Sequence, residues 1–227
     1  MGQSSLFEEN EKIVPDDSSE IPAGIPGVLF ELSVEAYYAA LYASMSELPI
    51  EGEISRFVAK VAKAGKAAKS GGERAAAGRA AGDRGDPDAL TVLRAAGKVR
   101  HEIHRLIGLL RFELEPNGVY TARCAPDHYV LPALSEHFTL RFGETPWAII
   151  DEKRKLCLRR EGGGSARLVP WSPDPKATIP EKSTSDSWED LWRLYHRSIN
   201  NEARKNLRLQ RQFMPERYQK FLTEFKN

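Results

Sequence analysis

The sequence predicts an α+β fold, in which an antiparallel sheet built from two helix–hairpin units is covered by helices. Two observations predict it: each of two amphipathic helical segments is followed by a strand–turn–strand pattern, and the two units repeat with a period of roughly 37 residues. A helical C-terminal segment follows them. With 227 residues and 41% hydrophobic content, the chain is long enough for a core that needs no disulfide or metal.

The first unit begins with a helix that we expect to run from Asp88, its cap, to about Ile107. One face of this helix has apolar residues at helical spacing, namely Val92, Ala96, Val99, Ile103 and Leu106. A second stripe on roughly the opposite side is basic and consists of Arg94, Lys98, His101 and Arg105. The segments "LLRFEL" and "VYTARCA" then alternate around the turn "PNG", which predicts a β-hairpin.

The second unit repeats this pattern. The segment "PDHYVLPALSEHFTLRF" predicts a helix with Leu134, Phe138 and Phe142 spaced by four residues. "WAIID" and "LCLRR", joined by the turn "EKRK", predict a second hairpin, and "ARLVPW" adds a strand. From Ser187 the chain is helical again, and Pro215 suits the first turn of a last helix.

The N-terminal third is less regular. Residues 1–26 read as a mobile acidic tail, and residues 27–227 as a single domain. At the start of this domain, "GVLFEL" predicts a short strand. We expect Ser33 to cap the helix that follows, and a second short helix to cover about 54–63. The Ala/Gly/Arg-rich stretch at about 62–87 reads as a flexible basic insertion, because its repeated glycines oppose helix formation.

The net charge of +1 conceals an uneven distribution. Residues 1–53 hold eleven acidic residues and one basic residue, whereas residues 54–111 hold thirteen basic and five acidic residues. Basic regions of this kind can neutralise phosphates, although a solvated surface is the alternative. The candidate nucleic-acid-binding residues are Arg94, Lys98, Arg105, Arg208, Arg211, Arg217 and Lys220.

The basic residues near the C-terminus alternate with aromatic ones in "RLQRQFMPERYQKFLTEF". We expect Phe213, Tyr218 and Phe221 to anchor this segment on the core. The arginines and lysine between them would then grip DNA phosphate or an acidic partner.

Four residues are candidates for catalysis: His104, Asp127, His128 and His137. Asp127 either caps the following helix or orients His128 as an acid–base pair. The "HEIH" motif lacks the spacing of four residues that zinc proteases use, and we predict neither a metal nor a cofactor. The sequence contains no phosphate-binding glycine loop, nucleophile elbow or dinucleotide fingerprint.

No apolar run approaches the roughly 18 residues of a membrane span, and no secretory signal is evident. The two cysteines, Cys124 and Cys157, do not form a metal-type pair. We therefore expect a cytoplasmic protein without a membrane partner. In the acidic tail, the Gln3, Leu6 and Phe7 side chains of "QSSLF" resemble peptides that bind the bacterial sliding clamp, with chance similarity as the alternative.

Three blocks together resemble the bacterial DUF4130 family of DNA metabolism proteins: "KVRHEIHRLIGLLRFE", "PDHYVLPALSEHFTLRFGETPWAIIDEKR" and "RKNLRLQRQFMPERYQKFL". The resemblance covers roughly Leu90 to Phe225 and leaves the insertion outside. It implies DNA as a ligand and a radical-SAM DNA repair or modification protein as a partner, but it assigns no catalytic residue. The leading hypothesis is a repair accessory protein that binds nucleic acid; a nucleic-acid-processing enzyme and a pure assembly adaptor are the alternatives.

Overall fold

The computed structural model describes residues 27–173 and 206–222, with five single positions between them: Leu191, Leu194, Tyr195, Arg197 and Ser198. The predictions for the tail 1–26, and for most of the helix expected from Ser187, lie outside the described residues. The chain divides into two compact units. That residues 27–227 form a single domain stays a prediction. The "helical unit" comprises 27–104 and 127–130. The "sheet unit" comprises 105–126, 131–173 and 206–222.

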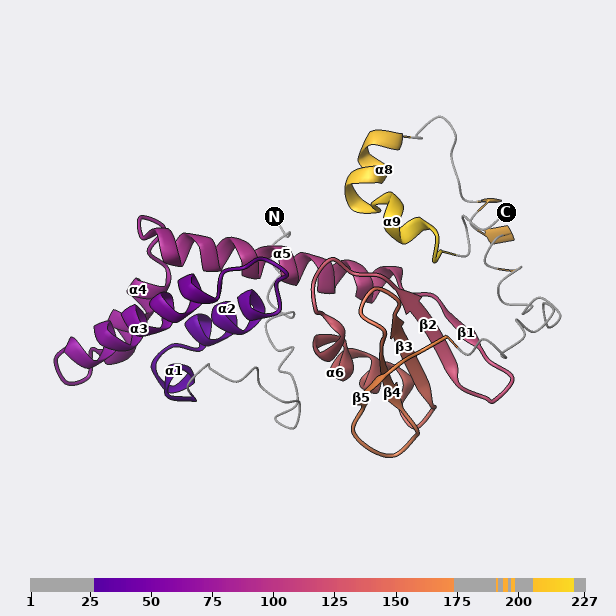
Figure 1. Ribbon diagram of the computed structural model, residues 1–227, viewed down its shortest axis with the longest axis horizontal. Coiled ribbons are helices and arrows are strands. Elements are labelled where there is room, and N and C mark those ends of the chain that lie inside the picture. Colours follow the sequence, from indigo (N-terminus) through magenta and orange to yellow (C-terminus); the bar gives the residue numbers. More distant parts are fainter. Residues whose placement is uncertain (1–26, 174–190, 192–193, 196, 199–205, 223–227) are drawn as a thin grey trace, which may run out of the picture. The chain divides into compact units, whose positions relative to one another are not determined.

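The helical unit is built from α1 (Gly27–Leu32), α2 (Val34–Ser44), α3 (Glu51–Ala67), α4 (Glu73–Ala81) and the first part of α5 (Pro87–Leu109). These helices share one core of small and apolar side chains, in which Leu29, Phe57, Val61 and Val92 are fully buried. Helices α3 and α4 lie side by side (Figure 1). The prediction that Ser33 caps a helix is confirmed, since its side chain accepts a hydrogen bond from the Ala36 amide at 3.1 Å.

Residues 27–32 form a helix rather than the predicted strand. The six-residue pattern was too short to distinguish the two, because a short apolar run carries no decisive period. Burial follows the helix: Leu29 is buried and Leu32 is half-buried, whereas Phe30 and Glu31 between them are exposed, a spacing of three rather than two.

The predicted flexible insertion at 62–87 is also helical. It holds the end of α3 and the whole of α4, and its buried positions include Gly65, Ala77 and Ala81. Small residues allow the two helices to approach closely, and this packing outweighs the low helix propensity of the glycines. The predicted second helix at 54–63 is correspondingly longer, from Glu51 to Ala67.

Helix α5 confirms the predicted core stripe, because all five of its residues are buried. Its cap, however, is Asp86 rather than Asp88. One Asp86 oxygen accepts hydrogen bonds from the amides of Asp88 (2.9 Å) and Ala89 (3.0 Å). Pro87 occupies the first helical position, where the missing N–H costs nothing.

The sheet unit confirms the α+β class with a five-stranded sheet in the order β1-β2-β3-β4-β5. The strands are β1 (Phe112–Leu114), β2 (Tyr120–Cys124), β3 (Trp147–Asp151), β4 (Leu156–Arg160) and β5 (Arg167–Pro170). Both predicted hairpins and the additional strand are present. The sheet is mixed rather than purely antiparallel, because β2 and β3 pair in parallel.

Helix α6 (Leu131–Phe142) explains the parallel pair, since it connects β2 to β3 and lets the chain return in the same direction. The helix packs on β3 and β4 (Figure 1). Its Phe138 and Phe142 lie against Trp147 with ring centroids 6.2 Å and 6.4 Å away. One sheet face is thereby covered by aromatic packing.

The C-terminal part of the sheet unit contains α8 (Leu207–Phe213) and α9 (Glu216–Gln219). Pro215 precedes α9 as its N-cap residue, one position earlier than predicted. None of the described helices is both long and apolar enough to cross a membrane.

Candidate nucleic-acid interface

The four candidate catalytic residues are distributed over both units. His104 is exposed on α5, and Asp127 and His128 lie in the short segment 127–130 of the helical unit. His137 is on α6 in the sheet unit, where its ring packs edge-on against Phe138 at 4.9 Å. Burial, and secondarily the charge of Arg141, lower the pKa of His137. Among the described residues, no group of three or more His, Cys, Asp and Glu side chains is placed to hold a metal ion.

Asp127 does not cap α6, which begins four residues later at Leu131. The segment is held instead by Glu102, a buried residue of α5 that the sequence analysis did not single out. Its two carboxylate oxygens accept hydrogen bonds from the amides of Asp127 (2.8 Å) and His128 (2.7 Å). The His128 ring nitrogen Nδ1 faces the Glu47 amide at 3.4 Å. The predicted Asp127–His128 pair therefore occupies a structurally fixed turn.

The predicted phosphate-binding residues are also divided between the units. Arg94 and Lys98 are exposed on α5 in the helical unit. Arg105, Arg208, Arg217 and Lys220 belong to the sheet unit; the side chain of Arg211 lies outside the described structure. Arg105 is half-buried and donates a hydrogen bond to the Gln212 carbonyl at 3.4 Å, so it contacts the C-terminal segment.

The anchors of the C-terminal segment differ from those predicted. Phe213 was expected on the core, but 64% of its surface is exposed. Tyr218 is buried as predicted, Phe221 is half-buried, and Leu222 is fully buried. A short segment broken at Pro215 cannot keep one helical face inward throughout, and the anchoring residues therefore follow the break.

Two predicted cations project beside these anchors. The Arg217 guanidinium lies over the Tyr218 ring at 4.7 Å and donates to its hydroxyl at 3.3 Å. The Lys220 ammonium lies 4.4 Å from the Phe221 ring centroid and 3.5 Å from a carboxylate oxygen of Glu152. Both side chains belong to exposed residues, so their charges remain available to solvent.

The Glu152 contact joins the C-terminal segment to the turn between β3 and β4. Asp151 shapes this turn: it is buried, and its oxygen Oδ1 accepts hydrogen bonds from the amides of Lys153 (2.9 Å) and Arg154 (3.1 Å). Its other oxygen binds the Arg154 guanidinium at 2.8 Å. The turn ends at Lys155, whose backbone is left-handed with φ 56°.

A second contact of Glu152 extends the group to strand β2, because the Arg123 guanidinium lies 3.8 Å from its carboxylate. Arg123 and Lys155 also lie over the Trp171 ring, 5.8 Å and 5.3 Å from its centroid. We call this connected set the turn cluster: Arg123, Glu152, Lys155, Trp171 and Lys220. It contains three cations and one carboxylate, and its net positive charge suits an anionic ligand.

Of this cluster, only Lys220 was predicted from the sequence as a binding residue. The "EKRK" turn was visible as a basic turn, and Arg123 as an outward residue of an alternating strand. Their meeting with Trp171 and the C-terminal segment depends on strand order, which the alternating pattern alone does not give.

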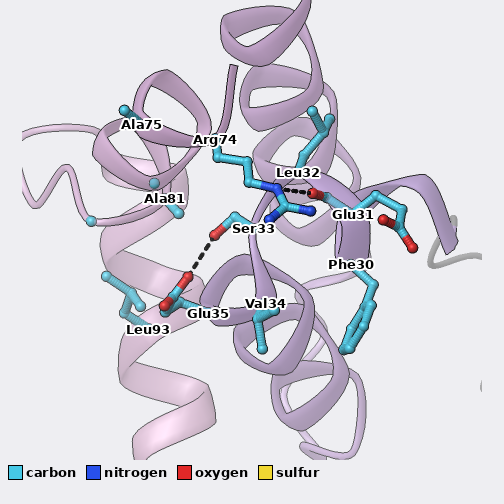
Figure 2. A pocket seen from close by; sticks show the side chains of 12 residues that line it. Phe30, Glu31, Leu32, Ser33, Val34, Glu35, Arg74, Ala75, Ala81 and Leu93 are labelled. Atoms are coloured by element: carbon cyan, nitrogen blue, oxygen red, sulfur yellow. Dashed lines mark hydrogen bonds between the residues drawn. The ribbon is translucent and has the colours of Figure 1, made fainter. Parts of the chain in front are cut away.

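A separate hollow of about 680 Å³ lies in the helical unit between α1, the start of α2, α4 and α5. Figure 2 shows its walls, formed largely by apolar and small residues, with two polar contacts at the rim. Arg74 donates to the Glu31 carbonyl at 3.1 Å, and the Ser33 hydroxyl donates to Glu35 at 3.0 Å. Because Ser33 also caps α2, its hydroxyl serves a structural role there.

One family profile matches the chain: DUF4130, described as a domain of unknown function, over residues 73–224. The match covers more than half of the 227 residues and includes all described residues of the sheet unit. It begins at the first residue of α4, inside the stretch that the sequence analysis placed outside the resemblance. No curated protein and no solved structure matches the chain.

Proposed function

We propose that this chain, which belongs to the DUF4130 family, is an accessory protein of DNA metabolism or repair that binds nucleic acid and acts with a radical-SAM partner. The observation that carries the proposal is the turn cluster: Arg123 of β2 and Lys220 of the C-terminal segment meet at the Glu152 carboxylate. Lys155 of the β3–β4 turn joins them through the Trp171 ring, over which both it and Arg123 lie. The partner comes from the family resemblance of the sequence blocks.

The turn cluster has the properties that phosphate contacts need. The three cations come from separate elements, so the fold, rather than one mobile loop, sets their spacing. The Lys220 and Arg123 side chains are 58% and 50% exposed, which leaves them accessible to a ligand. Glu152 bridges these two and limits their mutual repulsion in the free protein. A phosphate that approaches them can replace this carboxylate as the counter-charge.

A salt titration of DNA binding tests the proposal. We would measure binding of a fluorescent duplex by anisotropy between about 50 and 200 mM salt, for the unmodified chain and for an Arg123→Gln, Lys155→Gln, Lys220→Gln variant. Removal of one phosphate-binding cation should reduce the slope of log K against log salt by about 0.9. Removal of all three therefore predicts a decrease of about 2.7.

The control must remove the same charge elsewhere. Lys66, Lys69 and Arg79 are exposed residues of the helical unit, and their joint change to Gln removes three positive charges away from the turn cluster. A slope that falls equally in both variants would show that only net charge matters. A chain that binds no DNA at any salt concentration would refute the proposal and leave the adaptor hypothesis.

The partner is tested separately by co-purification of this chain with the radical-SAM protein, followed by DNA-binding measurements on each protein alone and on the pair. A complex that forms while the isolated chain fails to bind DNA would favour an assembly adaptor. A complex that processes DNA, with activity lost in His128→Ala but retained in the partner alone, would favour the enzyme hypothesis.

We also propose the sliding clamp as a partner of the acidic tail, on the basis of Gln3, Leu6 and Phe7, which lie outside the described residues. A peptide covering residues 1–12 should bind the bacterial clamp with micromolar affinity, about −8 kcal/mol. The Leu6→Ala, Phe7→Ala peptide is the control. Equal binding of both peptides, or binding of neither, would remove the clamp from the proposal.

A further inference from the structure

Among the described helices, α6 packs on one of the two faces of the sheet. Cross-strand register places Trp147, Ile149 and Asp151 of β3 on the same face as Arg160, Leu158 and Leu156 of β4. Trp147 packs against the aromatic side chains of α6, so this face is the one that the helix covers. The opposite face carries the alternate residues of each strand.

That opposite face has an apolar centre with a basic margin. Ala148, Ile150 and Cys157 form its centre, and Val119, Val169 and Trp171 pack against them. Desolvation at this centre raises the pKa of the Cys157 thiol and keeps it neutral. The register also assigns Arg123, Arg159 and Arg167 to this face, and all three are exposed.

Trp171 is fixed at the edge of this face. Its amide donates a hydrogen bond to the Lys155 carbonyl at 2.8 Å, which extends the pairing of β5 with β4 by one further hydrogen bond. The indole is half-buried: it packs on the apolar centre, and the Arg123 guanidinium and the Lys155 ammonium lie over its ring. A base that displaces these two flexible cations from the ring gains a stacking surface, and the released cations can bind its phosphates.

We propose that this sheet face binds unpaired nucleotides of a single nucleic-acid strand, with a base stacked on Trp171 and the backbone phosphates held by Arg123 and Lys155. The inference rests on the proposed nucleic-acid binding and specifies its ligand. Charge complementarity selects an anionic chain as the occupant, and the aromatic ring selects one that carries exposed bases. In a duplex each base stacks on its neighbours within the helix, so its flat face cannot reach Trp171.

The test compares single-stranded and duplex oligonucleotides in two variants of the full chain. Trp171→Leu keeps an apolar side chain on the centre but removes the ring, whereas Trp171→Phe keeps a ring. We expect Trp171→Leu to weaken single-strand binding by roughly 5- to 150-fold, equivalent to about 1–3 kcal/mol per stacked base. Trp171→Phe should retain most of the affinity, and duplex binding should change little in either variant.

Leu168 of β5, the strand that Trp171 directly follows, gives a control. It is partly exposed at 38% and lies on the opposite face of the sheet, because it pairs with Leu158. Leu168→Ala should leave single-strand binding unchanged. Polyglutamate, an anion without bases, should compete with the oligonucleotide much less effectively than an unlabelled single strand does.

The outcomes separate this inference from the proposed function. Equal loss of single-strand affinity in Trp171→Leu and Leu168→Ala, or no loss in Trp171→Leu, would refute the stacking site while salt-dependent binding stands. If polyglutamate competes as well as a single strand does, the site binds anions through charge alone and does not recognise bases. Absence of binding to both oligonucleotides would refute the proposed function as well.

Discussion

Replacement of Glu102 should loosen the segment 127–130 within the helical unit, where the Tyr129 amide still donates to the Met45 carbonyl at 2.9 Å. The carboxylate is buried, and it accepts hydrogen bonds from the amides of Asp127 and His128 at 2.8 Å and 2.7 Å. Glu102→Ala leaves these two donors without their acceptor. A hydrogen bond to a charged group is worth about 1.5–3 kcal/mol, so the loss of two should cost about 3–6 kcal/mol.

The Glu102→Gln variant should lose only one of the two hydrogen bonds. Its carbonyl oxygen can accept from one amide, but its NH₂ group then faces the other amide as a second donor. We expect a cost of about 1.5–3 kcal/mol, close to half of that for alanine. Glu51, an exposed residue in the first turn of α3, provides the control: Glu51→Gln should cost only a few tenths of a kcal/mol.

Hydrogen exchange measured by NMR is the direct assay, because it reports on the two amides themselves. If the segment opens locally at a cost lower by about 3 kcal/mol, exchange at Asp127 and His128 should accelerate by roughly 100-fold in Glu102→Ala. Urea unfolding gives the global cost. Unchanged exchange at both amides would refute the view that Glu102 holds this segment.

Three further predictions concern packing and charge. Gly78→Ala should stabilise the protein by about 0.4–1 kcal/mol in thermal unfolding, because an added Cβ meets no atom within 4 Å inside α4; a decrease in stability would contradict this. Phe213→Ala should change stability by less than about 0.5 kcal/mol, whereas Tyr218→Ala should cost about 3–5 kcal/mol; equal costs would mean that the exposed ring is structural. Hydrogen bonds from Arg56 and Lys60 lower the pKa of Asp88 below its usual 3.8. The ionised Asp88 carboxylate therefore stabilises the folded state fully above pH 3.8. This stabilisation is lost as the pH falls through the lower pKa that the carboxyl has in the folded state. The unmodified chain should therefore lose more stability than Asp88→Asn on acidification below about pH 4, and parallel pH profiles would contradict this.

The sequence predicted correctly those helices and strands whose hydrophobic pattern extends over enough residues to identify its period. The stripe from Val92 to Leu106 spans four helical turns, and all of its members are buried. The two hairpins were predicted because alternation on both sides of a turn leaves few other structures. The segment 27–32 has neither advantage, and its conformation is set by packing in the helical core.

The site was less predictable because its residues meet through tertiary structure. Lys220 could be identified by its basic and aromatic neighbours in sequence. Arg123, Glu152 and Trp171 are separated along the chain, and they meet only because β2 lies beside β3 and β5 follows β4. Glu102 was hidden for a similar reason, since its partners are backbone amides some 25 residues away.

Lys155 combines a strained backbone conformation with a side chain that belongs to the turn cluster. A non-glycine residue with φ 56° lies in a region that side chains with a Cβ adopt at some cost, and glycine would remove that cost. The surrounding contacts hold the residue there: Asp151 fixes the start of the turn, and the Trp171 amide binds the Lys155 carbonyl. A lysine at this position places its ammonium over the indole, which a glycine could not do. Backbone strain that is retained beside a cation and an aromatic ring supports a ligand-binding role for the turn cluster.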